Sequence, residues 1–223
     1  MKPIGAIVAA AGTGTRFGTQ GKALVMLEKV PLIVWVCRAF LAAKINHIWI
    51  TALPDQIEEI KSVLAKESIH ATVLSGGKTR QESVKIAFDA CKHLVQAVLV
   101  HDVARPMASK DLIRQILLKG KTEQAVIPVL PLSDTLKRIR HGYVEKTLSR
   151  EALYTVQTPQ FFDIHTLEKS YQEPIDTLAT DEATLVENRG IPVATIPGDW
   201  TNLKITYPED LIRAQQYLLL QQL

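Results

Sequence analysis

Short apolar runs alternate with amphipathic stretches along most of the chain. The apolar runs have the length of strands and lie at 4–9, 47–53, 71–74, 97–101, 125–130 and 192–196, with another near Val156. Between them, apolar positions recur at helical spacing and predict helices over 31–44, 55–66, 80–92, 110–119, 164–171, 181–188 and from 206 onward. Because such alternation is typical of βαβ units, the pattern predicts an α/β fold with a mainly parallel sheet.

Capping signals mark the predicted starts of several helices. The segments Thr79–Glu82 and Thr206–Glu209 match the capping box, in which a hydroxyl and a carboxylate satisfy the first free backbone N–H groups. Ser109 and Thr180 are the expected N-caps of two further helices. These signals predict where the loops that precede the helices end.

The pattern changes between residues 133 and 152. Two short runs over 136–148 flank His141-Gly142 and predict a β-hairpin. The hairpin and its flank are basic and carry Lys137, Arg138, Arg140, Lys146 and Arg150. A charged hairpin that leaves an α/β core fits either a lid or an arm for a partner subunit. We therefore expect one domain over 1–223, with 133–152 as an arm.

Composition and charge exclude several classes of protein. The chain has 223 residues, of which 47% are apolar and 22% charged, a balance that excludes a disordered chain. Its 26 basic and 23 acidic residues give a net charge of +3, so we expect no nucleic-acid partner, although the small excess suits anionic substrates. No apolar run reaches the ~18 residues of a membrane span, so we expect no membrane partner. Cys37 and Cys91 lie in predicted helices, which favours reduced thiols and a cytoplasmic location.

A loop of small residues follows the first predicted strand. It comprises Ala9, Ala10, Ala11, Gly12, Thr13 and Gly14, and the cations Arg16 and Lys22 come after it. In open α/β sheets ligands bind beyond the carboxyl ends of the strands, where successive N–H groups of such a loop can cradle an anion. The spacing matches neither a Walker A motif nor the dinucleotide fingerprint. Small residues beside two fixed cations suit a triphosphate, and the alternative is a tight turn with two solvated cations.

Other polar residues follow later strands. Asp102 comes directly after the strand at 97–101, where a carboxylate can hold Mg²⁺ beside substrate phosphates or can instead pair with Arg105. The hydroxyls of 133–135 suit a phosphate or polyol, or a turn. Lys204 stands between apolar neighbours before the last helix, where its alternative role is that of an edge-strand lysine. The histidines form no i, i+4 pair and no Gly-x-Ser-x-Gly segment occurs, so we expect neither a zinc site nor acyl transfer.

Seven motifs in a fixed order make the chain similar to a known family. They are Ala-Ala-Gly-x-Gly-x-Arg at 10–16, Gly-Gly at 76–77 ahead of Arg80 and Ser83, His-Asp-x-Ala-Arg-Pro at 101–106, Asp-Thr-x-Lys-Arg at 134–138, Thr-Pro-Gln-Phe-Phe at 158–162, Thr-Asp-Glu-Ala at 180–183 and Asn-x-Lys-x-Thr-x-Pro-Glu-Asp at 202–210. Each motif is weak alone, but seven in order are a strong signal. The set resembles the 2-C-methyl-D-erythritol 4-phosphate cytidylyltransferases of the non-mevalonate isoprenoid pathway, over nearly the whole chain.

The resemblance implies a fold and an activity. The fold is a Rossmann-like nucleotidyltransferase fold with a mainly parallel mixed sheet, helices on both faces and a protruding β-hairpin arm that builds a homodimer. The activity is transfer of CMP from CTP to 2-C-methyl-D-erythritol 4-phosphate, by in-line attack on the α-phosphate, with Mg²⁺ or another divalent cation.

The resemblance also implies roles for particular residues. The expected catalytic residues, which contact the triphosphate, are Arg16, Lys22 and Lys204. The expected substrate-binding residues are Asp102, Arg105, Thr135, Arg150, Thr158 and Thr180, of which Thr135 and Arg150 act across the subunit boundary. The expected nucleotide-binding residues are Ala9, Ala10, Ala11, Gly12, Thr13, Gly14, Gly77, Ser83 and Asp102, and Asp102 is also the expected metal ligand.

The chain departs from the family pattern on the nucleotide side. Lys78 stands where the family often has an acid, the loop between Arg16 and Lys22 is one residue short, and Gly21 and Ala23 replace a common proline and glutamine. Three other functions stay open. They are a cytidylyltransferase for another polyol phosphate such as ribitol 5-phosphate, a non-catalytic nucleotide-binding regulator, and a dinucleotide-dependent oxidoreductase, which the loop spacing disfavours.

Overall fold

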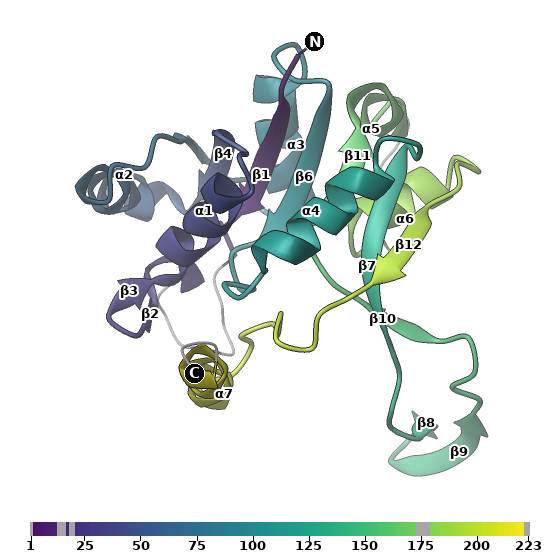
Figure 1. Ribbon diagram of the computed structural model, residues 1–223. Coiled ribbons are helices and arrows are strands. Elements are labelled where there is room, and N and C mark those ends of the chain that lie inside the picture. The colour runs from purple at the N-terminus through teal and green to yellow at the C-terminus, as the bar shows by residue number, and fades with distance from the viewer. Residues whose placement is uncertain (1, 13–16, 18–20, 173–178, 221–223) are drawn as a thin grey trace.

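A mixed sheet crosses the centre of the molecule in the computed structural model, which describes residues 2–12, 17, 21–172 and 179–220 (Figure 1). Within these residues eight strands pair in the order β10-β7-β11-β6-β1-β4-β5, with β12 beside β7. The strands are β1 (Ile4–Ala9), β4 (His47–Ala52), β5 (Thr72–Ser75), β6 (Ala97–Asp102), β7 (Ala125–Pro131), β10 (Tyr154–Val156), β11 (Gln160–Asp163) and β12 (Ala194–Pro197). The pairs β1–β4, β4–β5, β1–β6 and β7–β12 are parallel, while β10 and β11 run antiparallel to their neighbours. The predicted mainly parallel mixed sheet is therefore confirmed.

Helices cover both faces of this sheet. They are α1 (Leu32–Ala42), α2 (Ile57–Lys66), α3 (Arg80–Cys91), α4 (Lys110–Lys119), α5 (Ile164–Ser170), α6 (Glu182–Glu187) and α7 (Glu209–Leu220), with short 3₁₀ turns η1 (Lys22–Leu24) and η2 (Pro54–Gln56). Ala6 and Val8 of β1 enter one core with α1, α2, α4 and α7, whereas Ile7 enters a second core with α3, α5 and α6. Because each central strand is buried on both faces, it reads as a continuous apolar run.

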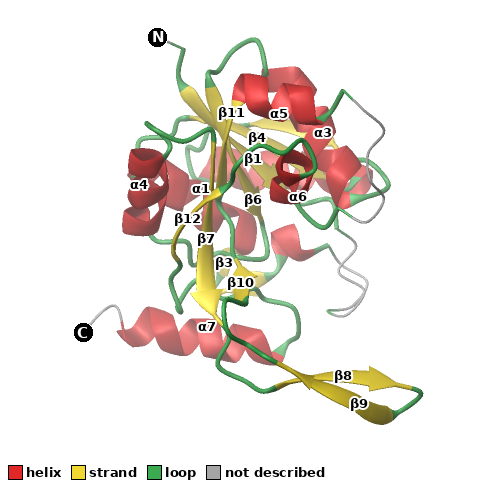
Figure 2. Cartoon of the chain, turned by 90° about the vertical axis from the view of Figure 1, so that its right-hand side faces the viewer, coloured by secondary structure: helices red, strands yellow, loops and turns green. Residues whose placement is uncertain are grey.

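Two small two-stranded sheets lie outside the main sheet. One pairs β2 (Met26–Leu27) with β3 (Val30–Pro31), and the other pairs β8 (Leu136–Arg140) with β9 (Tyr143–Leu148). The second is the predicted hairpin, and His141 and Gly142 at its turn have φ of 50° and 84°, as a two-residue I′ turn requires. In Figures 1 and 2 this hairpin extends well away from the main sheet. It forms the protruding arm.

Two strand features were not predicted. Strand β11 inserts antiparallel between β6 and β7, with Phe161 in one core and Phe162 in the other. Four residues after a proline are too few to show a period-2 pattern. The β2–β3 pair is shorter still, at two residues a strand.

The capping signals are confirmed at two helices. The hydroxyls of Thr79 and Ser109 accept the backbone N–H groups of Glu82 and Leu112, at 3.0 and 3.2 Å. The Glu82 carboxylate differs from the predicted capping box, since it accepts from the N–H of Lys78 and not from that of Thr79.

Two other predicted caps are wrong by one residue. Helix α6 is capped by Asp181 and not by Thr180, because the Asp181 carboxylate accepts the N–H of Thr184 at 3.0 Å. Ahead of α7, the carboxylate that reaches back is that of Asp210 and not that of Glu209, and it accepts the N–H groups of residues 206 and 207. Aspartate is the stronger cap in both places, because its short side chain folds back on the local backbone.

His101 is a polar side chain enclosed at the end of β6. It is fully buried, and its ring meets the ring of Phe40 edge-on, with centroids 5.5 Å apart. Nε2 of His101 lies 2.9 Å from the carbonyl of Arg105, which can only accept, so Nε2 carries a proton. Burial disfavours a second proton on the ring, so His101 is neutral and its Nδ1 accepts from the Thr158 hydroxyl, 2.9 Å away. The same hydroxyl accepts from the Asp102 N–H at 3.1 Å. Burial lowers the pKa of His101 to about 4.

We predict that His101 makes the protein less stable as the pH falls. Between about 6.5, the pKa of an unfolded histidine, and about 4, the unfolded chain takes up a proton that the folded chain refuses. The free energy of unfolding should therefore fall by about 3 kcal/mol across this window. Urea unfolding at several pH values measures it. His101→Gln should flatten the dependence and His141→Asn, on the exposed turn, should not; equal slopes for His101→Gln and wild type would contradict the prediction.

Candidate active site

The carboxyl ends of four parallel strands meet at one edge of the sheet. Ala9 at the end of β1 is in register with Thr51 of β4 and with Asp102 of β6. The backbone continues the pairing beyond these ends, since Gly76 after β5 donates to the carbonyl of Ala52 at 2.8 Å. In doubly wound sheets a crevice opens where connections diverge to opposite sides of a strand, as they do here around β1.

A cavity of about 170 Å³ lies at this edge. Its walls mix small residues with charged ones, and they are Ala9, Ala11, Gly12, Lys22, Arg80, Ser83, Asp102, Val103, Ala104 and Lys204. A larger hollow of about 610 Å³ lies between α2 and β5, but the only formally charged side chain among its described lining residues is Lys61. We place the candidate site in the smaller cavity, because there three cations and a carboxylate converge.

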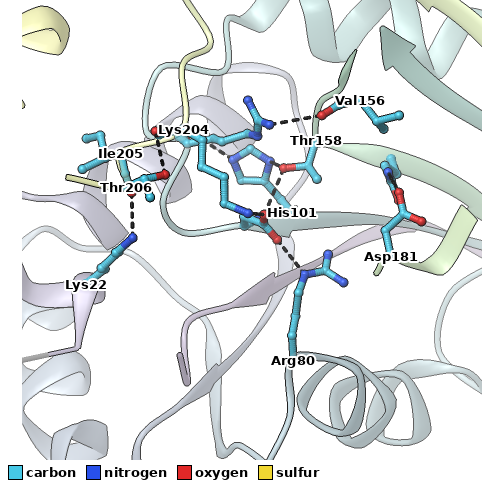
Figure 3. A network of polar contacts seen from close by, with 12 residues as sticks. Lys22, Arg80, His101, Val156, Thr158, Asp181, Lys204, Ile205 and Thr206 are labelled. Carbon is cyan, nitrogen blue, oxygen red and sulfur yellow. Dashed lines mark hydrogen bonds and ion pairs between the residues drawn. The ribbon is translucent and has the colours of Figure 1, made fainter. Parts of the chain in front are cut away.

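Asp102 is the centre of that charge cluster. Its Oδ1 accepts from Nε of Arg80 at 2.8 Å and its Oδ2 accepts from Nζ of Lys204 at 2.7 Å. Figure 3 shows the Arg80 and Lys204 side chains approaching the end of β6 from opposite directions. Burial alone would raise the pKa of Asp102, but Arg80 and Lys204 hold it well below its usual range. The carboxylate is therefore charged at neutral pH and both of its oxygens are engaged.

Arg80 also binds a second buried acid. Its Nη1 lies 2.9 and 3.1 Å from the two carboxylate oxygens of Glu182, which is completely buried. Burial raises the pKa of Glu182, and the charge of Arg80 opposes that rise. Nη2 of Arg80 is itself buried and has no hydrogen-bond partner among the described residues. One guanidinium thus links the start of α3 to the start of α6 and to the end of β6.

Lys22 lies on the opposite wall of the cavity, at the start of η1. Its Nζ donates to the carbonyl of Ile205 at 2.8 Å, and the ring of Phe17 has its centroid 6.0 Å from the same nitrogen. The N–H of Ile205 in turn donates to the carbonyl of Ala104 at 2.7 Å. These bonds hold Lys22 and the segment that carries Lys204 beside the loop after β6, so both lysines line the same cavity. Their contact with a triphosphate stays a prediction.

Gly76, in the loop after β5, lets that loop touch the loop after β1 beside the cavity. A Cβ on Gly76 would lie 2.1 Å from the Cβ of Ala11, so a side chain there would push the loops apart. The N–H of Gly77 donates to the hydroxyl of Ser83 at 3.1 Å, and that hydroxyl donates to the carbonyl of Thr79 at 2.8 Å. Gly77, Ser83 and Ala11 are therefore neighbours. Gly77 and Ala10 are not among the described lining residues, and contact of this set with a nucleotide stays a prediction.

Three predicted substrate-binding residues lie around the cavity and not in its walls. Thr158 is buried with its hydroxyl engaged by His101 and the Asp102 backbone. Arg105 donates to the carbonyls of Asn202 and residue 156, at 2.8 and 3.2 Å, which ties the segment before α7 to β10. Thr180 is exposed and lines an adjoining hollow of about 360 Å³ together with Arg80. Contact of these three residues with substrate stays a prediction.

The remaining predicted residues fall on the arm or outside the described chain. Thr135 and Arg150 are exposed on the arm, where Arg150 donates to the carbonyl of Ser133. Neither lines the cavity of its own chain as far as the described residues define it. Arg16, with Thr13 and Gly14 of the nucleotide loop, lies outside the residues that the structure describes.

Sequence reasoning did not assign a role to Arg80 or Glu182. Both stand inside motifs that carried the resemblance, at 76–83 and 180–183, and each is the first residue of its helix. The available signal was a charged residue directly after an N-cap, at a position where a helix start commonly faces a site. That signal could not show that the two side chains meet.

The donor set at Asp102 fits a divalent cation held mainly by a substrate. Over the residues described, no three histidine, cysteine or acidic side chains gather into a metal cluster. Mg²⁺ in phosphate-transfer sites commonly binds one or two carboxylates together with substrate phosphates and water. Asp102 is the one acid among the described lining residues, and Lys204 would have to leave Oδ2 for a metal ion to bind there. Asp102 would hold the ion, and the nucleotide would supply most of its other ligands.

The described helices include none that is long and apolar enough to cross a membrane.

Comparisons with known proteins show which sequences this chain is similar to. The model of the 2-C-methyl-D-erythritol 4-phosphate cytidylyltransferase family matches residues 4–220. A protein of that name from Streptomyces avermitilis is 36% identical over 227 residues, with 96% of this chain and 90% of the relative covered. A bifunctional enzyme IspD/IspF from Desulfotalea psychrophila is 39% identical over 98% of this chain, which spans 57% of that longer relative.

A solved structure gives the same result in three dimensions. The 2-C-methyl-D-erythritol 4-phosphate cytidylyltransferase from Thermus thermophilus superposes with a TM-score of 0.82 at 31% identity, covering 96% of this chain and 98% of that one. The predicted Rossmann-like nucleotidyltransferase fold is thereby confirmed. Because the family model spans nearly all of the sequence, this chain belongs to the 2-C-methyl-D-erythritol 4-phosphate cytidylyltransferase family.

Proposed function

We propose that this chain transfers CMP from CTP to 2-C-methyl-D-erythritol 4-phosphate, giving 4-diphosphocytidyl-2-C-methyl-D-erythritol and pyrophosphate. Family membership over residues 4–220 supports the substrates. The observation that carries the reaction class is the convergence of Lys22, Arg80 and Lys204 on the cavity beside Asp102. Three cations around one carboxylate suit two phosphorylated substrates that must be held together.

The chemistry needs no general base. A phosphate monoester is largely a dianion at neutral pH, so its oxygen can attack the α-phosphorus of CTP directly while the bond to the leaving pyrophosphate breaks. The protein must align the two anions and neutralise the charge that develops on the transferring phosphoryl group and on pyrophosphate. Lys22, Lys204 and, outside the described residues, Arg16 supply that positive charge. His101, buried and neutral, is engaged on both nitrogens and takes no part.

The nucleotide lies against the small-residue loops in this proposal. Ala9, Ala11 and Gly12 line the cavity at the end of β1 with small side chains, and Ser83 lines it beside them. The N–H of Gly77 donates to the Ser83 hydroxyl. Small side chains let a base and ribose approach backbone donors closely. Mg²⁺, or another divalent cation held by Asp102 and the CTP phosphates, would neutralise phosphate charge.

We also propose a homodimer in which each arm completes the site of the partner. The hairpin β8–β9 pairs with no other described strand, and an isolated hairpin is marginally stable in water. The hairpin also carries three exposed apolar residues, and the exposed fractions of Ile139, Tyr143 and Val144 are 55%, 80% and 59%. Apolar side chains gathered on a protruding hairpin indicate a protein partner. Thr135 and Arg150 would then grip the acceptor phosphate of the opposite subunit.

A cytoplasmic location is part of the proposal. It is supported by Cys37 and Cys91, which are both free and buried, as in proteins of reducing compartments.

Release of pyrophosphate tests the activity directly. The protein is incubated with CTP and Mg²⁺ and with 2-C-methyl-D-erythritol 4-phosphate or ribitol 5-phosphate as acceptor. We expect release with the first acceptor only. Preference for ribitol 5-phosphate would make the protein a cytidylyltransferase for another polyol phosphate. Tight CTP binding without release of pyrophosphate would favour a nucleotide-binding regulator.

Lys22→Ala should lower kcat by about 10²–10³, the usual cost of losing one preorganised donor to a developing charge, with little change in KM for the acceptor. Steady-state kinetics measure both constants, and circular dichroism checks that loss of the bond to Ile205 leaves the fold intact. Lys61→Ala on α2 is the matched control and should match wild type. A rise in KM at unchanged kcat would assign Lys22 to ground-state binding only.

Subunit mixing tests the arm. Arg150→Ala should mainly raise KM for the acceptor phosphate. If arms act in trans, mixing Arg150→Ala with Lys22→Ala puts an intact arm over an intact cavity once in each mixed dimer. At an acceptor concentration well below the KM of Arg150→Ala, a one-to-one mixture then recovers about a quarter of wild-type activity. Failure of the mixture to exceed its two components after subunit exchange, verified by native mass spectrometry, would place the arm in cis.

A further inference from the structure

The two oxygens of Asp102 are held by unequal partners. Arg80, on Oδ1, has 28% of its side chain exposed, whereas Lys204, on Oδ2, has 47% exposed. A guanidinium binds in a rigid planar fork, while a lysine ammonium ends a flexible stem and exchanges partners readily. Oδ1 is therefore the fixed side of the carboxylate and Oδ2 is the exchangeable side.

Glu182 is what fixes Arg80. Both oxygens of Glu182 face Nη1 of Arg80, and over the described chain they accept no other hydrogen bond. Burying a charged carboxylate costs free energy unless an opposite charge pairs with it, so the ionised form of Glu182 depends on the ion pair with Arg80. Rotation of the guanidinium would leave Glu182 without its partner and would leave Asp102 with Lys204 alone, and this cost locks the orientation of Arg80.

The lock is built on rigid backbone. Arg80 is the first residue of α3 and Glu182 the first of α6, and each directly follows an N-cap whose side chain accepts a helix N–H. Both side chains therefore leave from defined helix starts and not from mobile loops. Such supporting residues set the orientation of a ligand side chain without touching the substrate.

We propose that Arg80, fixed by Glu182, is a positioning residue that keeps Oδ2 of Asp102 turned toward Lys204 and the cavity, ready for the divalent cation that enters with CTP. In the ligand-free protein Lys204 occupies this oxygen. A divalent cation held there with the nucleotide would take the place of Lys204, and Lys204 would then be available to the phosphates. The proposal rests on the cytidylyl transfer proposed above, and it assigns to Glu182 an effect on metal use although Glu182 does not line the cavity.

Glu182→Gln tests the proposal because glutamine keeps the size of the side chain and removes its charge. Mg²⁺-dependent CTP binding is measured by isothermal titration calorimetry, transfer by pyrophosphate release, and stability by thermal unfolding. We expect the Mg²⁺ concentration for half-maximal CTP binding to rise about tenfold and kcat to fall about 10- to 100-fold, the usual effect of losing a residue that supports a metal ligand. KM for the acceptor should stay within about threefold.

Two further variants separate positioning from folding. Glu168→Gln removes one ion-pair partner of Lys92, which lies 2.9 Å from Glu168 and caps the far end of α3, and it should leave the Mg²⁺ dependence unchanged. Arg80→Lys keeps one buried positive charge but cannot hold both carboxylates with a planar fork, so it should repeat the shift in Mg²⁺ dependence. If Glu182→Gln does not fold, the Mg²⁺ dependence of CTP binding is measured on Arg80→Lys instead.

The outcomes distinguish this proposal from the proposed function. A lower Tm with an unchanged Mg²⁺ dependence of CTP binding would overturn the positioning role and leave a purely structural ion pair. If wild type releases no pyrophosphate with either acceptor, the proposed function fails. A shifted Mg²⁺ dependence of CTP binding in Glu182→Gln would then still support the positioning of Asp102.

Discussion

The ion pairs that share Arg80 are the constraint on which the rest of this site depends. Glu182 and Asp102 are buried or nearly so, and two carboxylates in a poorly hydrated place repel each other and resist ionisation. One guanidinium between them makes both charges tolerable. That requirement fixes where α3 and α6 must begin relative to β6. The alternation of strand and helix brings three separate segments to the same edge, and the ion pairs then hold them there.

Close backbone approach is the second condition for the cavity. Gly76 lets the loop after β5 lie against Ala11, and the carbonyl of Ala52 accepts the Gly76 N–H. Without that contact, Arg80, four residues further on, would begin its helix in a different place. The close approach at Gly76 and the ion pairs of Arg80 therefore act together. The close approach brings the start of α3 to the sheet, and the ion pairs fix the side chain of Arg80, the first residue of that helix.

Much of the fold could be predicted from the sequence, because buried parallel strands and capped helices leave strong local patterns. The bounds of β1 and the start of α4 agree with their apolar run and N-cap. Strand β11 could not be predicted in this way, since its four residues are set by long-range pairing with β6 and β7. The site divides likewise. Asp102 ends β6 and Lys22 begins η1, and Lys204 lies in the loop before α7, in places where chemistry is expected. The link from Arg80 to Glu182, by contrast, spans 102 residues and has no local signature.

The balance of charge explains why such a cluster suits phosphoryl transfer. Lys22, Arg80 and Lys204 together carry three positive charges, against two negative ones on Asp102 and Glu182. The ligand-free cluster is therefore close to neutral, which spares the fold the repulsion of three unpaired cations. A bound triphosphate adds several negative charges to the cavity, and these attract the cations more strongly than the single charge of Asp102 does.

Lys204 is the most exposed member of these ion pairs and the one on a flexible stem, so it can change partners at the least cost in free energy. Arg80 cannot do so without unpairing Glu182. The same network thus combines a fixed carboxylate with an exchangeable cation, which is what a site needs when it must fold without its anionic substrates and then stabilise their reaction.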